Sequence, residues 1–395
     1  MVLKGKTVVL GVTGGIAVYK ALDVVSGLKK LGADVKVMMT KSATEFVSPI
    51  TFQTISQNPV AVSMFNEPKA WEIQHISLAK AADITAIVPA TANIIGKIAG
   101  GIADDMVSTT VMATTSPVII APAMNTNMYK NPILQRNIKT LKELGYLFIN
   151  PDSGRLACGD TGEGKLAQVD IIIDEIKNAL LYPEKDLKGK KILVTAGPTC
   201  EAFDPVRFIT NHSSGKMGYA IAKAASCRGA EVILVSGKTN ITPPKNLSFV
   251  SVTSAQDMYD AVMENADSCD VIIKAAAVAD YRPLNTADEK IKKSGDMTVS
   301  LTSNPDILKS LGEKFGGKKT LIGFCMETQD LIENATKKLK SKNLDFIVAN
   351  NIKNEGAGFG VDTNIVTIID KNGDKTELPL SSKEEVANKI LDRIK

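Results

Sequence analysis

The sequence predicts an α/β protein made of two doubly wound domains, each with a mainly parallel sheet. Short apolar, β-branched segments alternate with helical patterns along the 395 residues, which is typical of folds in which strands and helices take turns. A strand, a glycine-containing loop and a helix occur near the N-terminus, and the same succession begins again at Lys190. This second start predicts domains at 1–185 and 186–395, each long enough for its own core.

Composition argues against several classes of function. The net charge is only +4, and no basic block or aromatic RNA-binding motif indicates a nucleic-acid partner. The five dispersed cysteines include no CxxC pair, and with two histidines a structural zinc site is not expected. These cysteines and the lack of a signal-peptide pattern fit a cytoplasmic protein. Pro89, Asn93 and Lys97 interrupt the apolar stretch 84–103, which favours strand, loop and helix over a membrane span.

The first strand–loop–helix unit contains a candidate phosphate site. Thr7–Val12 reads as a buried strand, Gly14 and Gly15 lie in the loop, and apolar residues at helical spacing begin at Ala17. Glycines let the backbone approach a ligand, and a helix N-terminus offers free N–H groups to a phosphate. A merely tight turn is the alternative. Because the spacing is not GxGxxG and no acidic residue closes the second strand, at 32–40, a mononucleotide fits better than NAD.

Two further strands of the first domain end in small and polar residues. Ile84–Pro89 leads into Ala90–Asn93, and the strand that begins at Val118 leads into Asn125. The carboxyl ends of parallel strands meet at one edge of a sheet. We therefore expect these polar tips to lie together, with room for a flat ring against the backbone.

The end of the first domain carries a possible lid. Leu156–Gly164 contains three glycines and predicts a mobile loop. Its thiol, Cys158, makes it either a lid over a site or an ordinary surface turn. Residues 168–181 predict an amphipathic helix, and 182–189 predict a charged linker.

The second domain continues the alternation of strands and helices. The charged segment Asp288–Lys293 is either solvated surface or a flap over an anionic ligand. Asn364–Asp370 and 375–378 predict a hairpin with an Asn-Gly turn. The other predicted strands are 231–235, 271–276, 320–324 and 345–349, and the predicted helices include 254–266 and 330–343.

The helix predicted at 330–343 has two lysines at the margin of its apolar stripe. Leu331, Ala335 and Leu339 belong to that stripe at helical spacing. Lys338 and Lys342 lie one turn apart, where like charges repel by a few tenths of a kcal/mol. A bound polyphosphate would reverse that repulsion, and two solvated lysines are the alternative.

Five motifs, in order and divided between the two halves, resemble the bifunctional phosphopantothenoylcysteine decarboxylase / phosphopantothenate–cysteine ligase family of coenzyme A biosynthesis. The resemblance covers essentially the whole chain. It implies a flavodoxin-like N-terminal flavoprotein domain and a Rossmann-like ligase domain. The motifs are PAMNTNM at 122–128, ACGDTGEG at 157–164, ITNHSSGKMG at 209–218, AAAVADYRP at 275–283 and KIKK at 290–293.

In the N-terminal half the resemblance implies FMN, bound between the subunits of a trimer. Gly14, Gly15, Ile16 and Ala17 match the positions around the FMN phosphate, Thr40 and Ser42 add hydroxyl contacts, and Ala90, Thr91, Ala92 and Asn93 lie near the flavin ring. Tyr129 and Lys165 replace a Trp and an Arg that are frequent in the family, which leaves contact detail open.

The implied chemistry supplies an electron sink for decarboxylation. FMN oxidises the cysteine thiol to a thioaldehyde, CO₂ leaves, and a hydride from the reduced flavin then completes the reaction. By this resemblance His75 assists the oxidation, Asn125 binds the substrate carboxylate and Cys158 donates the final proton. Without the resemblance, a lone histidine before an apolar segment is usually structural.

In the C-terminal half the resemblance implies a ligase. CTP activates the carboxylate of 4′-phosphopantothenate as an acyl-cytidylate, Mg²⁺ accompanies the triphosphate, and L-cysteine displaces CMP. Lys290 matches the lysine required for cytidylate formation, and Asn211 matches the residue that turns over the intermediate. Arg207 matches the residue that holds the substrate phosphate, either in its own subunit or in a neighbouring one. The nucleotide-site positions are matched by Lys274, Ala275, Ala276, Asp280, Asn304, Pro305, Asp306, Ile307, Phe324, Lys338 and Lys342.

Trimeric decarboxylase and dimeric ligase contacts would together require a homo-oligomer with a multiple of six subunits, such as a dodecamer. Two other functions compete with the bifunctional enzyme: a flavoprotein binding or regulatory module that has lost one activity, and an NAD-dependent oxidoreductase. His75, Asn125 and Cys158 argue against the first, and the missing dinucleotide fingerprint argues against the second. Spacing alone does not distinguish CTP from ATP, and no metal ligands or role for His212 emerge.

Overall fold

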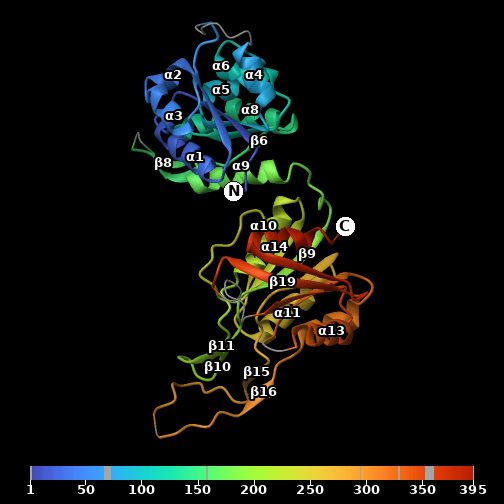
Figure 1. The fold of residues 1–395 in the computed structure, drawn as a ribbon. Coiled ribbons are helices and arrows are strands. Elements are labelled where there is room, and N and C mark those ends of the chain that lie inside the picture. The colour runs from blue at the N-terminus through green and yellow to red at the C-terminus, as the bar shows by residue number, and fades with distance from the viewer. Residues whose placement is uncertain are drawn as a thin grey trace. The chain divides into compact units, whose positions relative to one another are not determined.

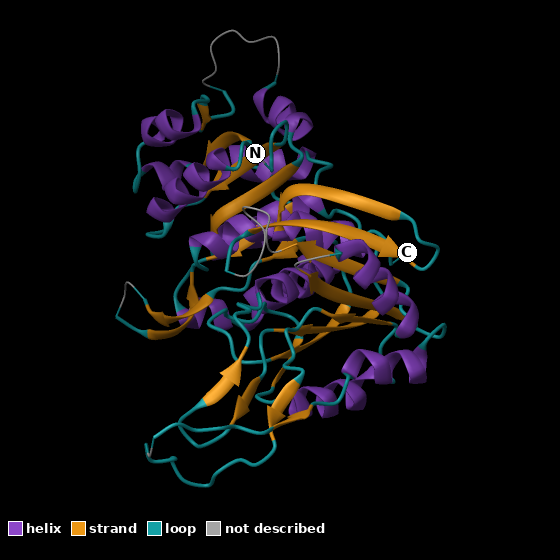
Figure 2. Ribbon diagram, turned by 60° about the horizontal axis from the view of Figure 1, so that its bottom comes forward, coloured by secondary structure: helices purple, strands orange, loops and turns teal. Residues whose placement is uncertain are grey.

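The chain forms two compact units, Met1–Pro183 and Glu184–Lys395. The computed structural model describes residues 2–65, 73–156, 159–293, 295–327, 330–351 and 360–394. Each unit contains one large sheet flanked by helices (Figures 1 and 2). The boundary predicted from the sequence falls two residues after the one that divides these units.

Unit 1 has a six-stranded parallel sheet in the order β3-β2-β1-β4-β5-β6. Without the two-residue edge strand β3, the order β2-β1-β4-β5-β6 is the flavodoxin-like one. With or without β3, the direction in which successive strands are added reverses between β1 and β4. The elements are β1 (Thr7–Val12), α1 (Val18–Lys30), β2 (Asp34–Met39), α2 (Lys41–Thr44), α3 (Pro49–Ser56), β3 (Val60–Ala61), α4 (Gln74–Ala81), β4 (Ile84–Ala90), α5 (Ala92–Ala99), α6 (Met106–Ala113), β5 (Val118–Pro122), α7 (Thr126–Lys130), α8 (Pro132–Glu143), β6 (Leu147–Phe148), β7 (Asp152–Arg155), β8 (Thr161–Lys165) and α9 (Val169–Leu181).

The alternation of side chains along β1 builds a core on both faces of this sheet. Val8 and Leu10 are buried in the cluster that includes α1 and α9 residues. Val9, between them, is buried in a second cluster that includes residues of α5, α6 and α8. Successive strand residues point to opposite faces. A strand covered on both sides must therefore be apolar throughout, which is why this segment is recognisable in the sequence.

The mobile loop predicted at Leu156–Gly164 is partly wrong, because its second half is strand β8. β8 pairs with β7 in an antiparallel hairpin. The glycines of β8 permit close packing: a Cβ at Gly164 would lie 2.4 Å from the Met124 carbonyl oxygen, and one at Gly162 would lie 2.7 Å from Thr126 Oγ1. Glycine inside a strand often marks such an approach of another backbone. Ala157 and Cys158 lie outside the described residues.

Unit 2 has an eight-stranded sheet in the order β13-β12-β9-β14-β17-β18-β19-β20. Its elements are β9 (Lys191–Ala196), β10 (Cys200–Ala202), β11 (Phe208–Thr210), α10 (Lys216–Cys227), β12 (Glu231–Ser236), β13 (Ser248–Ser251), α11 (Ala255–Ala266), β14 (Val271–Lys274), β15 (Tyr281–Pro283), β16 (Leu301–Ser303), α12 (Ile307–Phe315), β17 (Thr320–Glu327), α13 (Leu331–Ser341), β18 (Phe346–Asn351), β19 (Thr363–Asp370), β20 (Lys375–Ser382) and α14 (Lys383–Leu391).

Six strands of this sheet are parallel in the doubly wound order, and the hairpin β19–β20 extends it antiparallel. The predicted hairpin is confirmed, with Asn372 and Gly373 inside a four-residue connection. The ribbons β10–β11 and β15–β16 and the long connection between β15 and β16 project from the main sheet of unit 2 (Figure 1).

Part of the charged linker predicted at 182–189 packs on unit 2, where it contacts a buried arginine. Arg228, at the end of α10, is 4% exposed. Its guanidinium donates to both carboxylate oxygens of Asp186 and to Asp392 Oδ1 beyond α14. Leu187 is buried, and its N–H donates to the Arg228 carbonyl oxygen. The fold of unit 2 therefore begins before β9.

Three aspartates pin the amino ends of neighbouring parallel strands. Asp83 accepts the N–H of Thr7, Asp270 that of Lys191 and Asp345 that of Leu321, at 2.8–3.0 Å. Each carboxylate precedes one strand and caps the first free N–H of the strand beside it. These contacts fix the register of neighbouring strands in both sheets, and thereby the relative positions of their carboxyl ends.

Among the described residues, no helix combines the length and the apolar character that crossing a membrane requires.

We predict that Gly312→Ala destabilises unit 2. Alanine is usually favoured over glycine in a helix by about 1 kcal/mol. At Gly312, in α12, an added Cβ would lie 1.9 Å from the Lys342 carbonyl oxygen, so the backbone would have to move. We expect a net loss of about 2 kcal/mol and a lower midpoint for the thermal transition of unit 2.

Gly96→Ala in α5 is the matched control, because the nearest atom to its added Cβ, Asn137 Nδ2, is 3.9 Å away. We expect no destabilisation of unit 1 from it. A Gly312→Ala protein as stable as the wild type in differential scanning calorimetry would contradict this packing of α12.

Candidate active sites

The candidate site of unit 1 is the loop between β1 and α1, at the point where the strand order reverses. The loop packs directly on α2: a Cβ at Gly14 would lie 2.5 Å from Ser42 Cβ and 2.9 Å from its carbonyl oxygen. Gly14 is thus required by the approach of residues 28 positions away. No acidic residue lies in the first turn of α1, so its N-terminus can receive an anion.

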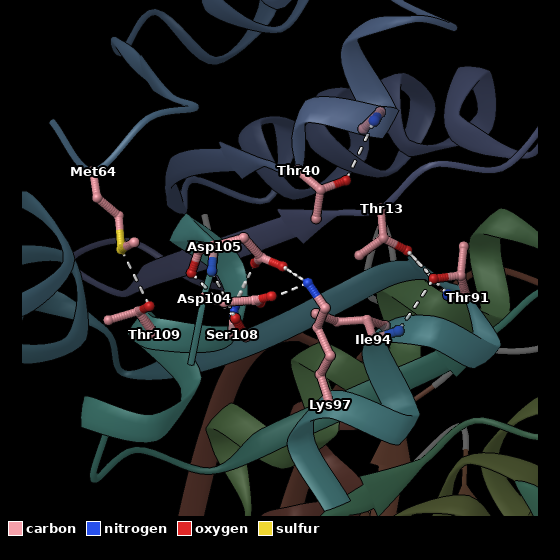
Figure 3. Close-up of polar contacts among 11 residues, drawn as sticks. Thr13, Thr40, Met64, Thr91, Ile94, Lys97, Asp104, Asp105, Ser108 and Thr109 are labelled. Atoms are coloured by element: carbon pink, nitrogen blue, oxygen red, sulfur yellow. Dashed lines mark hydrogen bonds and ion pairs between the residues drawn. The ribbon is translucent and has the colours of Figure 1, made fainter. Parts of the chain in front are cut away.

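A hydroxyl network ties this loop to the end of β4 (Figure 3). Thr13 is 1% exposed, and its Oγ1 donates to the Pro89 carbonyl oxygen at 2.7 Å and accepts the Thr91 N–H at 3.0 Å. Thr91 Oγ1 in turn caps α5 by accepting the Ile94 N–H. Thr40 caps α2 in the same way, through the Ala43 N–H. The structure thus brings the positions predicted for the phosphate and for the ring to one edge of the sheet.

An ion-pair cluster fixes the far end of α5 (Figure 3). Lys97 lies 2.6 Å from Asp104 Oδ1 and 2.7 Å from Asp105 Oδ2. Asp105 also caps α6, where its side chain accepts the Ser108 N–H. The helix α5, which begins at Ala92 and Asn93, the residues predicted to lie near the ring, is therefore held at both ends.

Asn125 lies against the tip of the β7–β8 hairpin. Its Oδ1 accepts the Asn127 N–H at the start of α7, which orients the amide, and its Nδ2 donates to Asp160 Oδ2 at 3.0 Å. The Met124 N–H donates to the Gly164 carbonyl oxygen beside it. Asn125 and Asp160 are therefore neighbours, and Cys158 lies outside the described residues.

His75 lies in the first turn of α4 and is half-buried. α4 packs on α6. None of the described hydrogen bonds joins His75 to Thr13, Thr91 or Asn125.

The candidate site of unit 2 is lined by backbone at the corresponding reversal point, between β9 and β14. A Cβ at Gly237 would lie 1.9 Å from the Pro198 carbonyl oxygen, and one at Gly218 would lie 2.6 Å from Ala196 Cβ. Gly197 and Gly215 have φ values of +73° and +79°, which only glycine adopts readily. The loops after β9 and β12 and the start of α10 are in close contact here, with the Thr239 side chain packed against Gly197 and Gly215.

A cavity of about 320 Å³ opens beside these glycines. Its size is at the lower end of the range for small-molecule sites. The residues predicted for the ligase site that line it are Asn211, Lys274, Ala275, Ala276, Asp280, Phe324 and Lys338. The Asn211 amide donates to the Ala277 carbonyl oxygen at 3.0 Å, which places it at the end of β14.

Lys274 lies in a positive environment at the end of β14. Burial, together with the nearby charges of Lys342 and Lys338, lowers the pKa of Lys274 to about 8, against the opposite influence of Asp306 and Asp280. Lys342 pairs with Asp306 at 2.9 Å. An anion in this place would relieve the repulsion among three lysines that come from two different elements.

Other predicted nucleotide-site residues form the rim beyond Asp280. The Asn304 N–H donates to the Asp280 carbonyl oxygen, and its amide donates to that of Ala279. Pro305 follows, Asp306 caps α12 through the Lys309 N–H, and Ile307 is buried in the core. Asn304 and Asp306 thus fix the rim, whereas Ile307 contributes packing.

Arg207 and Lys290 do not line the cavity. Arg207 is bound to the buried carboxylate of Asp204 at 2.6 Å. Lys290 is exposed on the connection between β15 and β16. Both predicted residues therefore lie on the projecting part of unit 2.

Four lining residues that the sequence did not suggest form another side of the cavity: Lys216, Asn350, Asn364 and Lys383. The Oδ1 atom of Asn350 is buried with no hydrogen-bond partner among the described residues, so it suits a ligand N–H group. Lys216 belongs to the GKMG motif and could have been suspected. The other three follow ordinary strand or helix patterns and gave no local signal.

No group of three or more His, Cys, Asp or Glu side chains that could hold a metal occurs in the described part of the chain.

Comparisons with known proteins cover both units. Two family models match: "Flavoprotein" over residues 2–181 and "DNA/pantothenate metabolism flavoprotein C-terminal domain" over residues 187–395. The coenzyme A biosynthesis bifunctional protein CoaBC of Bacillus subtilis (strain 168) is 52% identical over 395 residues, which is 99% of this chain and 97% of that protein. The protein of the same name from Escherichia coli (strain K12) is 42% identical over 398 residues, 100% of this chain and 98% of the relative.

Solved structures resemble each unit separately. The C-terminal domain of a CoaBC protein is 50% identical, with 53% of this chain and 96% of that chain covered and a TM-score of 0.47. The FMN-dependent cysteine decarboxylase SpaF is 28% identical, with 45% and 96% covered and a TM-score of 0.40. The full-length relatives decide the assignment: this chain belongs to the family of coenzyme A biosynthesis bifunctional proteins, CoaBC.

Proposed function

We propose that this chain catalyses two consecutive steps of coenzyme A biosynthesis. Unit 2 ligates L-cysteine to 4′-phosphopantothenate with CTP, and unit 1 decarboxylates the resulting 4′-phosphopantothenoylcysteine to 4′-phosphopantetheine with FMN. The observation that carries this proposal is that each unit has its own backbone-lined site at the carboxyl edge of its sheet, in a chain whose relatives match across both units. The later domain acts first.

The loop of unit 1 fits the phosphate of FMN. The absence of a side chain at Gly14 lets the loop lie against Ser42, and α1 directs its free N–H groups to the same place. Gly15, Ile16 and Ala17 complete the loop, and Ala90–Asn93 lie opposite, across the Thr13 network. When bound, FMN accepts and returns the hydride that makes decarboxylation possible.

Asn125 is suited to bind the substrate carboxylate. Its Nδ2 already donates to a carboxylate, that of Asp160, and its Oδ1 is held by the Asn127 N–H. A substrate carboxylate would take the place of Asp160 without reorienting the amide. We assign proton transfer in the oxidative half to His75 and the final protonation to Cys158. In a trimer, His75 can reach a site shared with a neighbouring copy.

In unit 2 the three lysines fit the polyphosphate of CTP. Lys274 and Lys338 line the cavity and Lys342 lies beside Asp306 on its rim, and Mg²⁺ would arrive with the nucleotide. A carboxylate oxygen of 4′-phosphopantothenate attacks the α-phosphorus and pyrophosphate leaves. The amine of cysteine then attacks the acyl carbon and CMP leaves. Lys290 stabilises charge in the first step, Asn211 assists the second and Arg207 binds the substrate phosphate.

Lys290→Gln tests the division of labour between the units. Because the lysine neutralises charge that develops on the α-phosphate, its loss should lower CTP-dependent pyrophosphate release by roughly a hundredfold or more. Decarboxylation of supplied 4′-phosphopantothenoylcysteine should continue at the wild-type rate. Product masses after incubation with 4′-phosphopantothenate, cysteine, CTP and Mg²⁺ give both readouts, and ATP in place of CTP tests the choice of nucleotide.

Lys309→Gln, an exposed lysine on α12, is the control for this substitution and should leave both activities intact. Loss of decarboxylation in Lys290→Gln would contradict independent sites. A wild-type protein that forms no ligated product would overturn the proposal itself.

We predict that CTP binding weakens above about pH 8. The pKa of Lys274 is lowered to about 8 in the free protein, and a bound polyphosphate raises it, so the bound state holds a proton that the free state loses as the pH rises. The dissociation constant should therefore be about tenfold higher at about pH 9 than at about pH 7. Titration calorimetry in buffers of different ionisation enthalpy measures the affinity and the proton uptake together.

Lys274→Met should bind CTP weakly and with a flat pH profile. Lys337→Met, on the exposed face of α13 and paired with Glu333, should keep the wild-type profile. A wild-type affinity that does not change over this pH range would show that Lys274 does not contact the anion.

We predict that Thr13→Val weakens FMN binding. The substitution keeps the side-chain volume but removes the partner of the half-buried Thr91 N–H and the donor to Pro89, at a cost of about 1–3 kcal/mol. If the network holds the flavin loops together, the dissociation constant should rise about tenfold or more, as measured by flavin fluorescence. Thr13→Ser, which keeps the hydroxyl, should bind nearly as the wild type. Equal affinity of the valine variant would rule out this role.

A further inference from the structure

Arg207 and Lys290 lie on segments that are attached to each other. Arg207 immediately precedes β11, and Lys290 lies 83 positions later, between β15 and β16. Both segments project from the main sheet of unit 2 (Figure 1). Neither residue lines the cavity, yet the proposed reaction needs both.

The attachment is made by Asp204, a carboxylate that is 1% exposed. Its Oδ1 accepts the N–H groups of Val206 and Arg207, at 2.8 and 2.7 Å. Its Oδ2 accepts Nε and Nη2 of Arg207, at 2.9 and 2.6 Å, and the N–H of Ile291, at 3.2 Å. Burial alone would raise the pKa of Asp204, but these five hydrogen bonds hold it well below its usual range.

Arg207 also contacts the Lys290 segment directly. Its Nη2 also donates to the Ile291 carbonyl oxygen at 2.6 Å, so the residue after Lys290 is bound through both its N–H and its carbonyl group. The segment before Lys290 is fixed as well: the Ala287 N–H donates to the Phe203 carbonyl oxygen, and Thr286 Oγ1 donates to that of Ala202. Lys290 thus projects from a connection that is pinned on both sides to residues 202–207.

The guanidinium keeps donors for a ligand in this arrangement. Nε and Nη2 make the contacts described, whereas none of the described hydrogen bonds uses Nη1, and the side chain is 40% exposed. A guanidinium has five N–H donors in a fixed fork. Arg207 can therefore bind a phosphate oxygen through Nη1 without releasing Asp204 or Ile291.

We propose that Asp204 is a positioning residue that joins Arg207 and Lys290 into one arm, so that both residues act on the same cavity. The proposal rests on the ligase function and on the roles assigned above to these two residues. Binding of the substrate phosphate by Arg207 then places Lys290 beside the nucleotide that the same substrate attacks. A single arm, rather than two independent loops, delivers both groups.

The test is a comparison of kinetic parameters in the full-length protein. Asp204→Asn keeps the shape but removes the charge, and it should both raise the KM for 4′-phosphopantothenate and lower kcat for pyrophosphate release, each about tenfold or more. Lys290→Gln should lower kcat alone. If Asp204→Asn changes KM while kcat stays within about twofold, the carboxylate serves Arg207 only and the proposal is wrong.

Two further variants separate positioning from folding. Asp257→Asn removes another carboxylate that accepts backbone N–H groups in unit 2, at the start of α11, and should leave both parameters unchanged. Arg207→Lys keeps the positive charge but loses the fork that reaches Ile291, so it should lower kcat even where Asp204→Asn fails to fold. A normal kcat in Arg207→Lys would overturn the coupling. These comparisons require that the wild-type protein releases pyrophosphate. If it does not, the proposed ligase function is wrong, and the result does not bear on Asp204.

Mixed oligomers of Arg207→Ala and Lys290→Gln chains test the shared cavity. If both residues of one arm serve one cavity, every cavity in the mixture lacks one of them and no activity returns. If the two residues serve different cavities, about a quarter of the cavities become complete, and a recovery of that size would contradict the proposal.

Discussion

The close approach of backbone segments at the two reversal points sets the shape of both sites. In unit 2 a Cβ at Gly237 would lie 1.9 Å from the Pro198 carbonyl oxygen, and in unit 1 a Cβ at Gly14 would meet the backbone of Ser42. Where loops from distant strands meet without side chains, peptide N–H groups can face a ligand directly. Surfaces of this kind would suit an anion next to a ring rather than one particular molecule.

The two units place their polar groups by different means. In unit 1, Thr13 fastens the two loops of the site to each other with neutral hydrogen bonds inside the protein, and the neighbouring ion pairs of Lys97 lie at the other end of α5. In unit 2, burial and the nearby charges of Lys342 and Lys338 lower the pKa of Lys274, against the opposite influence of Asp306 and Asp280. The first arrangement is complete without a ligand. The second favours one, since a bound anion removes an unfavourable interaction already present.

Local pattern was sufficient for most strands and helices and for some site residues. Strands such as β1 are apolar throughout because they are covered on both faces, and the lysine at 338 was singled out by its position on a helix whose stripe residues Ala335 and Leu339 are indeed buried. The sequence predicts a mobile loop at β8 because glycine normally weakens a strand, whereas here glycine admits the backbone of Met124 and Asn125 and the side chain of Thr126. Asp204 was missed for a different reason: it contacts Ile291, 87 positions away, and no short segment of sequence records such a pairing.

Residues on the sheet of unit 2 and residues on its projecting arm are held in place by different contacts. Residues fixed by the sheet, such as Lys274 at the end of β14, hold their places through the register that the aspartates at the opposite edge impose. A group on a projecting segment has no such register and needs its own anchor. A buried carboxylate with five donors is a strong one, because losing any partner leaves a desolvated charge. Asp204 therefore gives Arg207 and the Lys290 segment a fixed mutual geometry.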